Sequence, residues 1–177
     1  MKIDILQVGN LKTNCYILEK ENTCIVIDPG DEFKKIDNKL NGKEISAVLI
    51  THNHFDHVGA LDDIIKKYNP RLLKFDNLEE REYIINKFRF KVILNPGHSS
   101  DSVSFLFEKE NIIFCGDFIF KGDVGRCDLP TGNYTQMLES IRKIKNYDNL
   151  IIYPGHGEST TLEFEKKYNP YFKIEKI

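Results

Sequence analysis

Four potential metal ligands stand within six residues of the chain: His52, His54, Asp56 and His57. They directly follow residues 47–50, an apolar run of strand length. In an extended chain, residues two apart point the same way, so His52 and His54 can bind one ion. If a helix begins near Asp56, the chain turns there, and Asp56 and His57 can face a second point nearby. Imidazole and carboxylate groups are ligands for zinc, iron and manganese, so this spacing predicts a metal centre.

Three further candidates are His98, Asp117 and His156, and each lies in a Gly-containing loop after a strand-like run. With His98 and His156, all five histidines of the chain are assigned to one site, whereas structural histidines normally scatter. Asp28 lies in an Asp-Pro-Gly turn, and turn chemistry explains it. We therefore expect Asp28 to support the site rather than to bind metal.

The candidate ligands need elements that hold them, and the apolar pattern predicts a layered α/β chain. Strand-like runs, bounded by Gly, Pro and Asn turn signals, cover residues 3–8, 14–18, 23–27, 47–50, 71–75, 91–94, 103–107, 111–115 and 150–153. Helical spacing of apolar residues covers 31–40, 58–68, 78–88, 134–144 and 158–168. Every candidate ligand follows the end of a strand, where a sheet fixes the backbone and loops present side chains.

The composition describes one ordinary globular domain of 177 residues with a formal net charge of −2. That charge offers no basic field, so a nucleic-acid partner is not expected. No apolar run approaches the roughly 20 residues that cross a bilayer, and the N-terminus lacks a signal-peptide pattern. We therefore expect a cytoplasmic protein without a membrane partner. The four cysteines form no C-x-x-C pair, which favours reduced, buried thiols, except that Cys127 lies in a Gly-rich loop.

Over nearly its whole length the chain resembles the metallo-β-lactamase-fold hydrolases. Five segments match in order, namely Asp28-Pro29-Gly30, Thr51-His52-Asn53-His54-Phe55-Asp56-His57-Val58-Gly59, Pro96-Gly97-His98, Gly116-Asp117 and Pro154-Gly155-His156-Gly157. The resemblance implies an αββα sandwich of class α/β (α+β), with two mixed sheets flanked by helices and the metals at one edge. The ligand sets that it implies are His52, His54 and His98 for one metal, Asp56, His57 and His156 for a second, and Asp117 as a bridge between both.

The stretch from Gly116 to Pro130 is similar to that of short bacterial glyoxalase II-like hydrolases, which carry a Gly-Arg-x-Asp loop. We expect a single domain over residues 1–177, without the C-terminal helical domain by which full-length glyoxalase II enzymes hold glutathione. Persulfide dioxygenases of the same fold share this loop but usually continue with Phe-Gln. Leu129-Pro130 stands there in this chain, which favours hydrolysis.

Two cations about 3.5–4 Å apart can share a water and lower its pKa from about 15.7 toward about 7. The resulting metal-bound hydroxide suits esters, thioesters, lactones and β-lactams, and a thioester fits best because its thiolate leaves with little protonation. The resemblance suggests that Asp56 orients the hydroxide and accepts its proton, while Asp117 holds the metal pair. The sequence thus predicts a binuclear hydrolase, with zinc as the first choice and iron or manganese as alternatives, acting on a hydroxyacyl-thiol conjugate. Alternatives are a mononuclear-iron persulfide dioxygenase and another ester or lactone hydrolase of this fold.

Arg126 is the best candidate for binding an anionic part of the substrate. An equal alternative is that Arg126 pairs with Asp128 or Asp123 and only stabilises its loop. Cys127 is predicted to be a small loop residue rather than a nucleophile, since no sixth histidine remains to activate it. The acyl group, the thiol carrier and the oligomeric state stay open.

Overall fold

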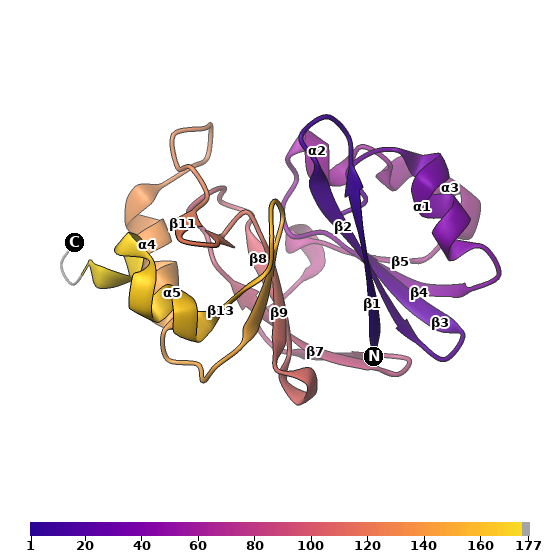
Figure 1. The fold of residues 1–177 in the computed structure, drawn as a ribbon. Coiled ribbons are helices and arrows are strands. Elements are labelled where there is room, and N and C mark those ends of the chain that lie inside the picture. Colours follow the sequence, from indigo (N-terminus) through magenta and orange to yellow (C-terminus); the bar gives the residue numbers. More distant parts are fainter. Residues whose placement is uncertain (175–177) are drawn as a thin grey trace.

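Two mixed β-sheets lie face to face in the computed structural model, which describes residues 1–174 (Figure 1). Helices cover the outer face of each sheet, so the layers run helix, sheet, sheet, helix. The predicted αββα arrangement is therefore confirmed.

The N-terminal sheet has five strands in the order β1 (Lys2–Val8), β2 (Thr13–Lys20), β3 (Thr23–Ile27), β4 (Glu44–Leu49) and β5 (Arg71–Leu73). The first three are antiparallel neighbours, whereas β3, β4 and β5 run parallel. The helices of this half are α1 (Phe33–Leu40), α2 (Phe55–Val58) and α3 (Leu61–Tyr68). Ile36, Leu40 and Ile64 point from α1 and α3 into a cluster with Val26 and Val48 of the sheet.

The C-terminal sheet has six strands in the order β13 (Thr160–Thr161), β12 (Ile151–Pro154), β9 (Ile112–Gly116), β8 (Val103–Phe107), β7 (Phe88–Leu94) and β6 (Glu82–Ile85). Its outer face is covered by α4 (Tyr134–Ile144), α5 (Leu162–Tyr168) and the 3₁₀ helix η3 (Pro170–Lys173). The remaining short elements are η1 (Phe75–Asn77), η2 (Glu108–Glu110) and the hairpin of β10 (Ile119–Phe120) and β11 (Asp123–Val124).

The main core fills the space between the two sheets. Tyr16 and Leu18 of β2 meet Phe90, Phe105 and Phe114 of the facing sheet, and all five side chains are buried. The alternation of buried and exposed positions along β6 and the start of β7 follows from the period of two in a strand. Each such aromatic ring removed from water contributes about 1.5–3 kcal/mol of folding free energy.

The predicted helix over residues 78–88 is wrong. This segment contains β6 and the start of β7, joined by a tight turn in which Ile85 pairs with Phe88. Asn86 in that turn has a φ of 49°, in the left-handed region that Asn tolerates. Tyr83 and Ile85 are buried while Glu82 and Ile84 are exposed, so the alternation marks a strand.

The predicted final helix over residues 158–168 begins later than expected. The chain first forms the short strand β13, and α5 starts at Leu162, where the Thr161 side chain accepts a hydrogen bond from the Phe164 amide. The 134–144 helix has the predicted bounds. No helix within residues 1–174 is long and apolar enough to cross a membrane.

Candidate metal centre

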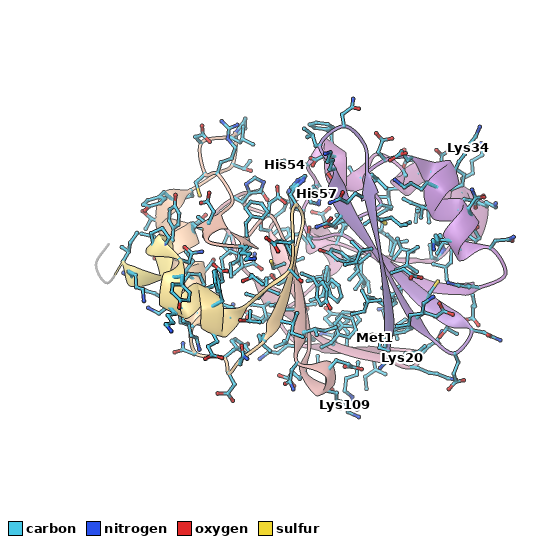
Figure 2. The ribbon with its side chains drawn as sticks, in the orientation of Figure 1. Met1, Lys20, Lys34, His54, His57 and Lys109 are labelled. Atoms are coloured by element: carbon cyan, nitrogen blue, oxygen red, sulfur yellow. The ribbon has the colours of Figure 1, made fainter. Side chains whose placement is uncertain are left out.

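The candidate ligands come together because several strands end at the same edge of the sandwich. The parallel pair of β3 and β4 ends at Asp28 and His52, and the parallel pair of β9 and β12 ends at Asp117 and His156. Parallel strands present their carboxyl ends at one edge, so these residues face each other across the two sheets. Figure 2 shows His54 and His57 at this edge, where the N-terminal and C-terminal halves meet.

The first group of candidate ligands consists of His52, His54 and His98. Nε2 of His52 lies 3.1 Å from Nδ1 of His54, which lies 2.9 Å from Nε2 of His98. These three nitrogens lie within 4.8 Å of one another, the spacing that a shared ion requires. Burial lowers the pKa of His52 well below its ordinary value, and the charge of His57 acts in the same direction. Neutral imidazole, the form that binds metal, is therefore favoured in this group.

The second group consists of Asp56, His57 and His156. Oδ2 of Asp56 lies 3.5 Å from Nε2 of His57 and 3.2 Å from Nε2 of His156. Burial alone would lower the pKa of His57, but the carboxylates of Asp28 and Asp117 raise it to about 10. Without a cation, the carboxylates thus hold a proton on His57, which indicates that the centre is shaped for positive charge.

Asp117 lies between the two groups. Its Oδ1 atom is 3.3 Å from Nε2 of His57, and its Oδ2 atom is 3.6 Å from Nε2 of His98 and 3.5 Å from Nε2 of His156. Burial alone would raise the pKa of Asp117, but the neighbouring His156 and His57 side chains, together with the positive charge of His57, bring it well below its ordinary value. Asp117 therefore presents an ionised carboxylate to both groups.

Two buried atoms show that a cation fits this centre. Within residues 1–174, Nε2 of His57 and Oδ1 of Asp117 are buried and have no hydrogen-bond partner. A buried polar group without a partner costs about 1–3 kcal/mol, so a native protein rarely leaves two of them face to face. A divalent ion bound between nitrogen and carboxylate ligands would satisfy both atoms, and this donor set suits zinc, iron or manganese.

A second layer of contacts orients the histidines. Nδ1 of His57 lies 2.9 Å from Oδ2 of Asp28, and Nδ1 of His52 lies 3.1 Å from Oγ1 of Thr51. The Thr51 hydroxyl donates to Asp28 over 2.6 Å, which links the two histidines through one carboxylate. Asp28 thus supports the centre from its turn, as the sequence predicted. Such partners fix the tautomer and the ring orientation of a metal-binding histidine.

Backbone carbonyls orient the two remaining histidines, His98 and His156. Nδ1 of His98 donates to the carbonyl of Arg126 over 2.7 Å, and Nδ1 of His156 donates to the carbonyl of Leu11 over 3.1 Å. In both rings Nε2 is then free to face the centre. Sequence reasoning did not find these partners, nor Thr13, whose hydroxyl donates to Oδ2 of Asp56 over 2.8 Å.

The loop of His156 is held in place by β2. The Asn14 side chain donates to the carbonyls of Pro154 and Gly157, and the amide of Asn14 donates to the carbonyl of Gly155. A Cβ atom on Gly155 would lie 2.2 Å from Oδ1 of Asp117, so only glycine fits there. The Pro-Gly-His-Gly motif therefore combines a ligand with the close backbone approach that it needs.

A cavity of about 1070 Å³ opens beside the centre, and His54, His98 and His156 form part of its wall. Arg126 also lines this cavity, but its side chain is paired with Asp128 through two contacts of 2.7 Å. The structure thus places Arg126 beside the centre and also shows the pairing that the sequence left as the alternative. Burial raises the pKa of the half-buried Cys127 thiol, and Asp128 adds to this effect, which disfavours a nucleophilic thiolate.

The profile of the metallo-beta-lactamase superfamily matches residues 8–82 and 70–156. Among curated proteins, a probable metallo-hydrolase of Streptococcus pyogenes serotype M6 is 32% identical, over 90% of this chain and 85% of that protein. The hydroxyacylglutathione hydrolase GloC of Haemophilus influenzae is 28% identical, over 97% of this chain and 98% of that protein.

Two solved structures agree with these sequence matches. The BLEG-1 B3 metallo-beta-lactamase superimposes with a TM-score of 0.93 and 28% identity, covering 98% of this chain and 100% of its own. TTHA1623 in a di-iron-bound form superimposes with a TM-score of 0.87 and 29% identity, covering 95% of this chain and 99% of its own. A profile match over most of its length, together with the shared fold and its own edge of candidate metal ligands, places this chain among the metallo-hydrolases of the metallo-β-lactamase superfamily.

Proposed function

We propose that the protein is a binuclear metal-dependent thioester hydrolase of the glyoxalase II type, acting on a hydroxyacyl-thiol conjugate. The similarity to a hydroxyacylglutathione hydrolase over 97% of the chain supports the reaction class. The similarity to a protein solved in a di-iron-bound form supports two metals. Zinc is the first choice of metal, with iron or manganese as alternatives, because histidine and carboxylate ligands accept all three.

The observation that carries the proposal is the position of Asp117 between two groups of three ligands. His52, His54 and His98 would hold one cation. Asp56, His57 and His156 would hold the second. The oxygens of Asp117 lie 3.3–3.6 Å from nitrogens of His57, His98 and His156, so this carboxylate is placed to contact both cations. When bound, the cations would activate a water as a nucleophile and polarise the thioester carbonyl.

Asp56 is the residue that we assign to accept the proton of the attacking water. Within residues 1–174, the carboxylate contacts Thr13, His57 and His156 through Oδ2 alone, so we assign Oδ1 to accept the proton. Burial alone would raise the pKa of Asp56, but the hydrogen bond from His156 and the charge of His57 lower it. The ionised carboxylate is therefore available as an acceptor. A thiolate leaves without a general acid, so no further proton donor is required.

The experiment that tests this function compares wild-type protein with Asp117→Asn. The variant keeps the side-chain shape but removes the charge that two neighbouring cations need between them, so we expect one metal to be lost. Thioester hydrolysis should fall by about 100-fold or more, because water activation and carbonyl polarisation both depend on the pair. Unchanged metal content and turnover in Asp117→Asn would contradict the proposal.

An oxygen-uptake measurement separates the hydrolase from a mononuclear-iron persulfide dioxygenase. The iron-loaded wild-type protein should consume no oxygen with glutathione persulfide, since Leu129-Pro130 follows the Gly-Arg-Cys-Asp loop. Rapid persulfide-dependent oxygen uptake without thioester cleavage would favour the dioxygenase. A panel that includes a simple ester and a lactone tests the other hydrolases of this fold. The single-domain organisation, the cytoplasmic location and the small-molecule partner stay predictions.

A further inference from the structure

The cavity beside the centre has an unusually exposed apolar wall. Phe55 is 77% exposed, Leu11 is 54% exposed and Phe75 is 37% exposed, and all three line the cavity. Phe120 and Leu129 add to this wall. Large apolar side chains gathered at a concave surface mark a place where a ligand is bound, because leaving them in water is unfavourable.

The wall is built from separate segments of the chain. Leu11 lies in the turn between β1 and β2, Phe55 is the first residue of α2, and Phe75 begins η1. Phe55 stands between the candidate ligands His54 and Asp56 in the sequence and lines the same cavity as both. The apolar wall and the candidate ligands therefore line one cavity, where a substrate would meet both.

Away from the candidate metal ligands, the positively charged side chain on the described cavity wall is already paired with a carboxylate. Within residues 1–174, Arg126 is the only lysine or arginine that lines it. Its Nε and Nη2 atoms contact the two carboxylate oxygens of Asp128 at 2.7 Å each, and this hydrogen-bonded pairing raises the pKa of the guanidinium. This pairing uses two of the five N–H donors of the guanidinium, and the Asp128 carboxylate offsets its charge, so its attraction for a substrate carboxylate is reduced.

Two carboxylates on the lining are not neutralised. Asp101 accepts from the amide and the side chain of Asn53, at 3.0 and 2.7 Å, and Asp123 accepts from the amide of Val124 at 2.8 Å. These donors are uncharged, and neither carboxylate has an ion-pair partner within the described part of the chain. Asp76 also lines the cavity but is paired with Lys74 at 2.8 Å. Away from the metals, the cavity is therefore apolar and negative.

We propose that the thiol portion of the substrate is apolar and either neutral or positively charged, and that carriers with carboxylates or phosphates are disfavoured. This inference rests on the proposed thioester hydrolysis and narrows its substrate class. Glutathione carries two carboxylates, and within residues 1–174 the only lysine or arginine of the wall is already paired with Asp128. Like charges across a partly solvated cavity reduce binding modestly, so the discrimination is expected to be about tenfold rather than absolute.

The test uses the metal-loaded full chain and three thioesters with one common acyl group. S-acetylthiocholine is positively charged, S-acetyl-N-acetylcysteamine is neutral, and S-acetyl-3-mercaptopropionate is negatively charged. The expected order of kcat/KM places the positive and neutral esters about tenfold above the negative one, mainly through KM. The acetyl ester of glutathione should resemble the negative ester.

A variant that frees Arg126 from its ion pair tests the charge preference more directly than the comparison of substrates. Asp128→Asn keeps the side-chain shape but frees Arg126, so kcat/KM for the negative ester should rise about fivefold and that for the positive ester should fall. Asp148→Asn is the matched control, because it removes the same charge from an exposed position that does not line the cavity. It should leave the ratio between the esters unchanged.

Non-cleavable thioether analogues of the positive, neutral and negative esters measure binding without hydrolysis. They therefore test the charge preference separately from the proposed function. Their dissociation constants, measured by calorimetry, should follow the same order. Charge-ordered binding without any turnover would reject thioester hydrolysis alone. Turnover with the negative ester as the best substrate, or an unchanged ratio in Asp128→Asn, would overturn the inference alone. No binding and no turnover would overturn both.

Discussion

Nε2 of His57 lies 3.3 Å from Oδ1 of Asp117, and within residues 1–174 neither of these buried atoms has a hydrogen-bond partner. Each residue is otherwise firmly held, since His57 contacts Asp28 and Asp117 faces His98 and His156. The side chains that would hold a cation are therefore also held by contacts within the protein. A cation that binds these side chains in the folded state alone would stabilise the fold.

We predict that the purified protein binds two metals per chain and that chelation lowers its Tm. Ligand that binds only the folded state at 100 times its Kd adds about 2.7 kcal/mol, which is several degrees for a chain of this size. His98→Ala should chiefly weaken one site, and His156→Ala the other. Elemental analysis of each variant, with calorimetric Tm values before and after chelation, checks this. Full activity at one metal per chain would exclude the two-metal centre.

A second prediction concerns Thr13, which is fully buried and donates to Asp56. Thr13→Val keeps the volume but removes the hydroxyl, so the carboxylate loses its fixed orientation. Partners of metal ligands are typically worth 10- to 100-fold in metal affinity or activity. We expect a loss of about tenfold in affinity for the second metal, with nearly full recovery in Thr13→Ser. Equal metal affinities in the valine and serine variants would show that the hydroxyl has only a packing role.

That the candidate ligands would come together could be predicted from the sequence because their signal is local. Four of them fall within residues 52–57, and the others follow predicted strands in Gly-containing loops. Strand ends are read from short apolar runs, and parallel strands then bring their carboxyl ends to one edge. Asp28 was also assigned a supporting role, and its contact with His57 agrees with this.

The partners of the ligands could not be predicted, because they come from distant parts of the chain. Thr13 is 43 residues from Asp56, and Leu11 is 145 residues from His156. Their contacts depend on how β2 lies across the two sheets, which no local pattern encodes. The helix prediction over residues 78–88 failed for another reason: Leu78, Ile85 and Phe88 have helical spacing, whereas the buried face of the strand is formed by Tyr83 and Ile85. The buried alternation at Tyr83 and Ile85 appears only once the facing sheet is in place.

A third prediction separates the four cysteines by their reactivity. Burial raises the pKa of Cys15 far above its ordinary value, that of Cys24 to about 11 and that of Cys115 to about 12. At pH 8 these thiols carry almost no thiolate and are shielded as well, whereas Cys127 is half-buried. A disulfide reagent should therefore modify one thiol per native chain and four after unfolding. Cys127→Ser should remove the native reaction, and rapid modification of more than one native thiol would contradict the burial.

The last prediction concerns Glu165, a fully buried carboxylate on α5. It accepts from the amide of Gly122 at 3.0 Å, from the Thr160 hydroxyl at 2.6 Å and from the Asn169 side chain at 2.7 Å. Gly122 lies between β10 and β11, and this hairpin lines the cavity through Phe120. Glu165 therefore connects a helix on the outer face to the substrate wall.

Glu165→Ala leaves three donors without their acceptor, so the free energy of unfolding should fall by about 2–4 kcal/mol. Because the hairpin loses its anchor while the metal ligands keep theirs, KM should rise several-fold with metal content unchanged. Leu40→Ala, in the core beneath α1, is a matched control that costs about 2–5 kcal/mol without touching the cavity. Denaturant unfolding gives the free energy of unfolding of each variant. Steady-state kinetics give KM under conditions in which both variants are folded. If KM changes equally in the two variants, Glu165 stabilises the fold and does not position the wall.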